Sequence, residues 1–156
     1  MTRMLRDRRG VAAVEAGIVL ALFITPLLSV MVGAGQGMLL QYRVDRALHT
    51  GLIYASWATG STATKPLVET AAQNGYGTAP PTMTATATYS CYCIPNTGTR
   101  SGVASTACST TCGTGTVLAR YVALTTADTY TPIFTMNWGS AAWTISATGT
   151  IRVPVS

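Results

Sequence analysis

The chain opens with a short polar segment and then becomes apolar over a long stretch. Residues 1–10 are rich in arginine and end in Gly10, and the 25 residues from Ala16 to Leu40 carry no charge. At a rise of about 1.5 Å per residue, this stretch forms roughly 37 Å of helix, enough to cross a hydrocarbon core of about 30 Å. It is too long for the apolar core of a secretory signal peptide. We therefore predict a membrane-spanning helix with a kink at Pro26.

Helical spacing continues beyond the uncharged stretch, to about Ala58. Apolar residues fall near one side of this helix and charged residues fall elsewhere. The apolar residues are Tyr42, Leu48, Leu52, Ile53 and Ala55, and the charged ones are Arg43, Asp45 and Arg46. A shorter helix is predicted for residues 66–74, because Pro66 suits a first turn and Gly75 suits the left-handed position after the last turn.

Three later segments have the composition and alternation of β-strands. They cover residues 82–93, 116–124 and 143–153, and they are rich in threonine, alanine and β-branched or aromatic residues. Residues 77–81 form a linker, and residues 96–114 form a Gly/Ser/Thr loop. The apolar segment 130–139 is expected to pack on the sheet or on a neighbour.

These elements predict an α+β fold. An antiparallel sheet of about three strands would cover the amphipathic part of the long helix and bury a small core. The expected organisation is a basic leader over residues 1–10, a transmembrane and juxtamembrane helix over 11–58, and an α+β domain with a cysteine loop over 59–156.

The charges predict how the membrane helix is oriented. Four arginines precede the span, namely Arg3, Arg6, Arg8 and Arg9, and two follow it, namely Arg43 and Arg46. Because positive flanks stay on the cytoplasmic side, the N-terminus is expected in the cytoplasm and the C-terminal domain in the periplasm. The whole chain has a formal net charge of +5, and residues 41–156 hold six basic and three acidic groups. With no basic cluster among aromatic residues there, nucleic acid is not an expected partner.

Four cysteines lie close together, namely Cys91, Cys93, Cys108 and Cys112. A cluster with an even number of cysteines in an exported domain predicts disulfides. A zinc site with four thiolate ligands is the competing interpretation. Of the three possible pairings, one would join Cys91 to Cys93 in a strained ring. A nested pairing (91–112 with 93–108) and a crossed pairing (91–108 with 93–112) both remain open.

The remaining side chains do not suggest catalysis or a cofactor. His49 is the single histidine, and nothing places a nucleophile beside it. The five acidic residues are scattered, and the glycines form no phosphate-binding pattern. Trp57, Trp138 and Trp143 are expected in the core or at an interface. We predict neither an enzyme nor a metal site.

The N-terminal segment Arg9-Gly10-Val11-Ala12-Ala13-Val14-Glu15 resembles that of TadE-like proteins, the pilin-like components of the tight adherence (Flp pilus) system. Residues 120–124, 130–132 and 143–153 resemble the C-terminal strands of the same family. Ala16 and Gly17 depart from the bulky residue that the family often places after the glutamate. The resemblance implies a type IV pilin-like fold in the bacterial inner membrane and a role as a minor pilin in pilus assembly and surface adhesion.

The resemblance also implies roles for three residues. A prepilin peptidase would cut after Gly10 and make Val11 the new N-terminus. Glu15 would then lie one helical turn away, where its carboxylate could pair with the α-ammonium of its own or another pilin-like subunit. The alternatives are a loop glycine before a helix for Gly10, and an interfacial residue at the membrane boundary for Glu15. The rival functions are a pseudopilin of a related secretion apparatus and a membrane-anchored module that binds through the cysteine loop.

Overall fold

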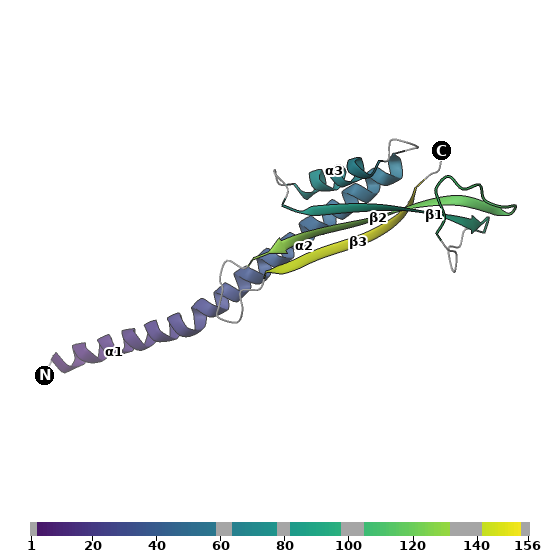
Figure 1. Cartoon of the computed structure of the whole chain (residues 1–156). Coiled ribbons are helices and arrows are strands. Elements are labelled where there is room, and N and C mark those ends of the chain that lie inside the picture. The colour runs from purple at the N-terminus through teal and green to yellow at the C-terminus, as the bar shows by residue number, and fades with distance from the viewer. Residues whose placement is uncertain (1–2, 59–63, 78–81, 98–104, 132–141, 154–156) are drawn as a thin grey trace. The chain divides into compact units, whose positions relative to one another are not determined.

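The structure is a computed structural model that describes residues 3–58, 64–77, 82–97, 105–131 and 142–153 (Figure 1). It has one long apolar helix and a small three-stranded antiparallel sheet, which confirms the α+β class. The described residues form two units. One holds the N-terminal helical residues up to Leu39 and Thr131, and the other holds the described residues of 40–130 and 142–153.

The N-terminal helix begins earlier than its sequence predicts. Helix α1 covers Arg3–Val19, and Gly10 lies inside it. The interpretation of Gly10 as a loop glycine before the helix is therefore wrong. Together with the segments that follow, the helix contains a 48-residue stretch, Gly10–Trp57, that is long and apolar enough to cross a membrane.

A π-helical segment, η1, occupies Leu20–Ile24 between α1 and helix α2 (Thr25–Trp57). It lies directly before Pro26, which has no backbone N–H and whose ring crowds the carbonyl four residues earlier. The Thr25 N–H donates to the carbonyl of Leu20, one residue further back than in an α-helix. The sequence predicted a kink at Pro26, and the structure has a local π-helical widening before this proline.

In the second unit, α2 buries a narrow stripe of mostly small residues. The buried positions are Val44, Ala47, Leu48, Gly51 and Ala55. Leu48 and Ala55 were predicted on this face. Tyr42 and Ile53 were also predicted on this face, but they do not lie on it, because they are 65% and 58% exposed.

Helix α3 covers Lys65–Tyr76, slightly longer than predicted. Pro66 lies in its first turn, and the residue that ends it in a left-handed conformation is Gly77, with φ 85°. The assignment of that role to Gly75 was wrong. Gly75 is inside the helix, and a Cβ there would lie 2.6 Å from Cβ of Thr50 on α2. Glycine is required at this position by close helix packing.

The sheet has the order β1-β2-β3, with strands Thr84–Pro95, Thr116–Tyr130 and Trp143–Val153. Both neighbouring pairs are antiparallel. The third strand has its predicted bounds, whereas β2 extends six residues beyond its predicted end at residue 124. Each step of two along a strand keeps side chains on one face, so one face meets the helices and the other is lined mainly by threonine, serine and alanine.

The core of this unit lies between that sheet face and helices α2 and α3. Its largest fully buried side chains from these elements are Val44, Val68, Val122, Leu124 and Val153. Trp57 and Trp143 are 82% and 62% exposed, so they do not belong to the core, and a place at an interface stays a prediction for both. Trp138 and most of the apolar connection 130–139 lie outside the described residues.

Candidate functional site

The predicted processing site lies on an exposed helical surface. Gly10, Val11 and Glu15 are all exposed in α1, and Val11 is 60% exposed. Val11 and Glu15 are four residues apart, so they lie on the same face, one turn from each other. A Cβ at Gly10 would touch nothing within 4 Å, so packing does not require glycine there.

The helical conformation has a consequence for any cleavage after Gly10. A protease that binds its substrate in an extended form must first unwind this turn. Glycine is less favourable than alanine within a helix by about 1 kcal/mol, so it lowers the cost of unwinding. The roles of Gly10, Val11 and Glu15 remain predictions.

The four cysteines form two disulfides, Cys91–Cys108 and Cys93–Cys112, with Cα–Cα distances of 5.1 and 5.5 Å. This is the crossed pairing, so the nested pairing is wrong. Because all four sulfurs are paired with one another, the zinc interpretation is also wrong. We call residues 91–97 and 105–116, joined by these bonds, the disulfide clasp.

The path of the chain explains the crossed pairing. Thr106 forms an isolated antiparallel bridge to Cys91, and a turn at Ala107–Thr110 then redirects the chain. Strand β2 begins at Thr116, directly opposite Pro95 at the end of β1. Cys112 lies only a few residues before Thr116, and therefore reaches Cys93, two positions from Pro95. The nested pairing would require the chain to run the other way along β1.

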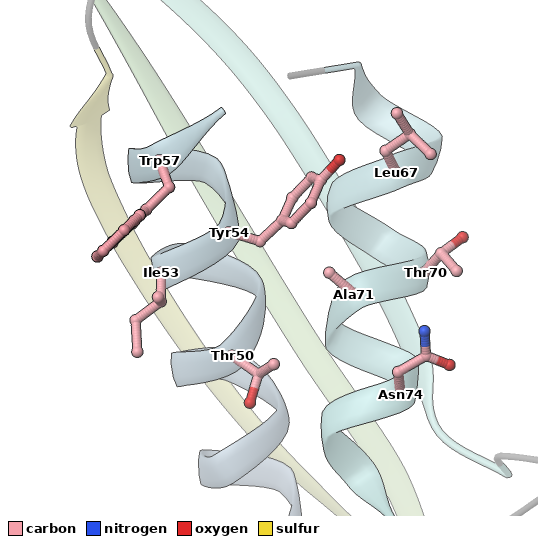
Figure 2. A pocket seen from close by; sticks show the side chains of 8 residues that line it. All are labelled: Thr50, Ile53, Tyr54, Trp57, Leu67, Thr70, Ala71 and Asn74. Atoms are coloured by element: carbon pink, nitrogen blue, oxygen red, sulfur yellow. The ribbon is translucent and has the colours of Figure 1, made fainter. Parts of the chain in front are cut away.

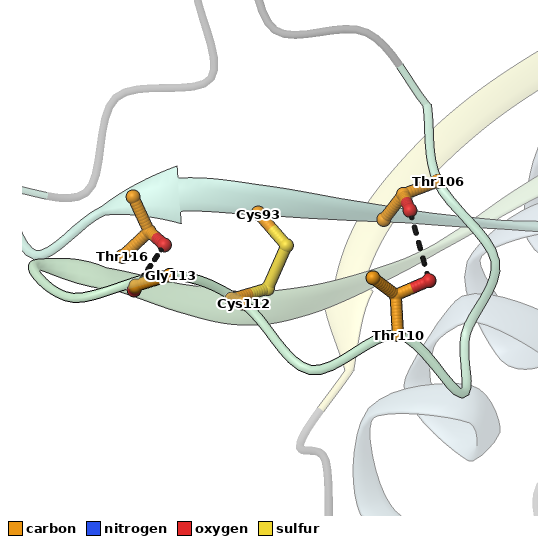
Figure 3. Close-up of a disulfide and its surroundings, with 6 residues drawn as sticks. All are labelled: Cys93, Thr106, Thr110, Cys112, Gly113 and Thr116. Carbon is orange, nitrogen blue, oxygen red and sulfur yellow. Dashed lines mark hydrogen bonds between the residues drawn. A yellow bond between two sulfur atoms is a disulfide. The ribbon is translucent and has the colours of Figure 1, made fainter.

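Hydrogen bonds and a second small core hold the clasp. Thr106 Oγ1 donates to Thr110 Oγ1 at 3.0 Å, and Thr116 Oγ1 donates to the Gly113 carbonyl at 2.7 Å (Figure 3). On the neighbouring strand positions, Tyr92 and Tyr121 meet edge to face with ring centroids 5.7 Å apart. The buried members of this second core are Tyr92, Ile94 and Ala119.

A buried carboxylate joins three elements of the second unit. Asp128 on β2 accepts hydrogen bonds from the hydroxyls of Tyr76, at the end of α3, and Thr82, just before β1. Its other oxygen accepts the N–H of Thr129 at 2.7 Å. Burial, followed by the bond to Asp128, raises the pKa of Tyr76 above its usual 10.0. This cluster anchors the α3–β1 connection to the end of β2.

Two further charged residues, Glu69 and Arg120, each have partners of their own in the fold. Glu69 Oε1 accepts the backbone N–H of Ala87 on β1 at 2.8 Å and lies 3.9 Å from Lys65 Nζ. The Arg120 guanidinium lies 4.3 Å from the centre of the Tyr89 ring, a cation–π contact. Both acids, Glu69 and Asp128, thus support the fold.

An open, largely apolar groove of about 570 Å³ lies between α2 and α3 (Figure 2). Tyr54 points across it toward α3, while Ile53 and Trp57 point away from α3. The other lining residues are Thr50, Leu67, Thr70, Ala71 and Asn74. The groove holds hydroxyl and amide groups but no acid, base or thiol, so it suits an apolar contact better than a reaction.

The residues considered for catalysis or metal binding are not brought together. His49 is exposed on α2. No group of three or more histidine, cysteine or acidic side chains lies close enough to hold a metal within the described part of the chain.

Asp128 is one of the five acidic residues that look scattered in the sequence, and its buried cluster was not predicted. One signal was present, because Asp128 continues the inward alternation of Val122, Leu124 and Thr126 along β2.

Comparison with known proteins gave no match to a family model, to a curated protein or to a solved structure.

Proposed function

We propose that this chain is a TadE-like minor pilin, or pseudopilin, of a tight adherence pilus. It is held in the bacterial inner membrane by one helix, is cut after Gly10 by a prepilin peptidase, and presents its α+β domain in the periplasm. Its role is pilus assembly and surface adhesion, through contacts with other pilin-like subunits. It is neither an enzyme nor a cofactor-binding protein.

The observation that carries this proposal is the arrangement of Gly10, Val11 and Glu15 at the start of a long apolar helix. All three are exposed on α1, and Gly10 has no packing reason to be glycine. A carboxylate next to a membrane segment needs a partner, and an α-ammonium created at Val11 would lie one helical turn away. Such a pair can set the axial position of one subunit against the next.

The disulfide clasp supports the proposed compartment. Disulfides persist in the periplasm and are rare in the bacterial cytoplasm. Both bonds are in the domain that the arginine-rich N-terminus would direct across the membrane.

The proposal is tested by intact-mass measurement of the chain isolated from envelopes of cells that contain an active prepilin peptidase. We expect a mass that lacks residues 1–10 and an N-terminus at Val11. Gly10→Ala should retain the leader, while Gly17→Ala, on the same helix and equally free of neighbours, should be cut normally. A chain that keeps Met1 or Thr2 in these cells would refute the processing step.

Assembly is tested separately from processing. Glu15→Ala should be cut at the normal rate but should fail to enter pili, measured as the loss of the protein from sheared surface filaments. If Glu15→Ala assembles normally, while deletion of the clasp loop alone abolishes attachment and leaves pili intact, the binding-module interpretation gains.

A further inference from the structure

Neither disulfide of the clasp joins cysteines that are consecutive in the sequence. Cys91 pairs with Cys108 and Cys93 pairs with Cys112, so each bond passes over a cysteine that belongs to the other bond. Figure 3 shows the second of these bonds, with Cys112 joined to Cys93 near the end of β1. The crossed pairing is therefore not reached by joining each cysteine to the next one along the chain.

Loop length along the unfolded chain does not select the crossed pairing. The native loops span 17 and 19 residues. Of the two nested loops, Cys93–Cys108 is two positions shorter than the first and Cys91–Cys112 is two positions longer than the second. Because the entropy cost of closing a loop grows only with the logarithm of its length, the native and nested loops close with probabilities within about twofold of each other.

The folded clasp is what selects the native pairs. Thr106 must bridge to Cys91, and Thr116 must lie opposite Pro95, before the sulfurs meet in the crossed order. Few packing contacts hold this path by themselves, since the second core has three buried side chains and residues 107–111 are exposed. We therefore expect part of the chains to close wrong bonds before the clasp has formed.

A chain that has closed two wrong bonds cannot correct itself. The sequence contains four cysteines, and the nested pairing consumes all of them, as the crossed pairing does. Exchange between disulfides requires a thiolate as the attacking group. The thiolate must therefore come from another molecule.

We propose that this domain is a substrate of a periplasmic thiol–disulfide isomerase, a dithiol protein that exchanges its wrong bonds for the crossed pair. The inference rests on the periplasmic placement in the proposed function, and it does not depend on cleavage at Gly10 or on pilus assembly. A separate disulfide oxidant first accepts two electrons and two protons for each bond that forms. The isomerase then acts without any net oxidation or reduction.

Three exchanges convert the nested pairing into the crossed one. The isomerase thiolate attacks the sulfur of Cys112 and releases the thiolate of Cys91. That thiolate attacks the sulfur of Cys108, forms the first native bond and releases the thiolate of Cys93. The Cys93 thiolate attacks the mixed disulfide at Cys112, forms the second native bond and releases the isomerase. Each exchange forms one S–S bond and breaks one, so no electrons are gained or lost.

Burial in the finished clasp protects the product from further exchange. Cys91 is 1% exposed, and Cys93 and Cys112 are partly buried, whereas Cys108 is exposed. An attack at Cys108 would release the thiolate of Cys91, which is held beside Cys108 by the clasp and would re-form the bond. Wrong pairs lack this protection, so repeated exchange should end at the crossed pairing.

The test compares two bacterial strains that both contain the disulfide oxidant, one with and one without the isomerase. The full chain is isolated with its free thiols blocked, and its bonds are reduced stepwise with a different alkylating label at each step, so that the labels identify the pairs. With the isomerase, nearly all chains should have the crossed pairing. Without it, the crossed fraction should fall by about twofold or more, because the nested pairing competes with loops of similar length. A small thiol added to the cells without isomerase should restore the crossed fraction, since any external thiolate can start the exchange.

A variant with two cysteines is the matched control. Cys91→Ser with Cys108→Ser leaves Cys93 and Cys112, which have only each other as partners, so this variant should oxidise equally in both strains. The proposal is overturned if wild type reaches the crossed pairing equally in both strains, or if the variant needs the isomerase as much as wild type does. Four free thiols in both strains would refute the periplasmic placement and this proposal with it, so the two failures are distinguishable.

Discussion

At the scale of single residues, Gly51 governs how α2 packs on α3 and β2. Gly51 of α2 faces the core, and an added Cβ would lie 3.0 Å from Ala72 Cβ and would overlap Leu124. Overpacking of this kind typically costs about 1–3 kcal/mol. We expect Gly51→Ala to lower the free energy of unfolding by about that amount, measured by chemical denaturation in detergent.

Gly113, which has open space around it, is the matched control for that substitution. Gly113→Ala should leave the free energy of unfolding nearly unchanged. Equal effects of the two substitutions would show that the packing of α2 on α3 and β2 is looser than described.

The Tyr76–Asp128 bond makes stability depend on alkaline pH. Burial first, and then the bond to Asp128, raises the pKa of Tyr76 above 10.0. The fold therefore favours the neutral phenol, so this stabilisation is complete below the pKa of the unfolded chain and is lost as pH rises through the folded pKa. We expect the unfolding free energy to fall above about pH 10, measured by denaturation at a series of pH values.

Tyr76→Phe separates this effect from general alkaline unfolding. It should be less stable at neutral pH, because Asp128 loses a buried donor, and its stability should fall less steeply above pH 10.0. Some slope should persist, since burial also raises the pKa of Tyr89. An unchanged slope would contradict the role of Tyr76.

At the scale of elements, the disulfide clasp can be divided into its two bonds. Cys91→Ser with Cys108→Ser removes one native bond and leaves the other able to form. Since each disulfide is worth about 2–4 kcal/mol, this pair should destabilise the domain by about that amount and leave no free thiol. Thiol counting and thermal unfolding measure both effects.

Cys91→Ser with Cys112→Ser is the mismatched control, because it leaves Cys93 and Cys108, which are not paired in the structure. We expect it to show free thiols and to be less stable than the matched pair. The reverse order would support the nested pairing.

Strand prediction succeeded where burial followed residue type. The third strand alternates apolar and polar residues over its whole length, so its bounds are readable from the sequence. In β2 the inward positions become polar at Thr126 and Asp128, so the apolar pattern in the sequence stops at Leu124. Those polar atoms are satisfied by the Val44 carbonyl and by Tyr76, which lie far away in the chain.

At the scale of the whole molecule, the arginines before the span should decide which side of the membrane receives the domain. Replacing Arg3, Arg6, Arg8 and Arg9 by Asn removes the positive bias of the N-terminal flank. We expect a substantial fraction of the chains to invert. Because disulfides form only on the oxidising side, non-reducing gel mobility of the clasp measures that fraction.

The control replaces Arg43 and Arg46 by Asn, which strengthens the original bias and should leave the clasp fully oxidised. If the first variant is also fully oxidised, orientation does not depend on the leader arginines.

The division between sequence and tertiary structure follows from the range of the interactions. A long uncharged run, arginine-rich flanks and two-residue alternation are local, and they were enough for the membrane-length helix, the α+β class and the third strand. The pairing of the cysteines, the role of Gly75 and the partners of Asp128 were decided only when the chain brought distant residues together. Each depends on which atoms lie opposite, and spacing along the chain does not contain that information.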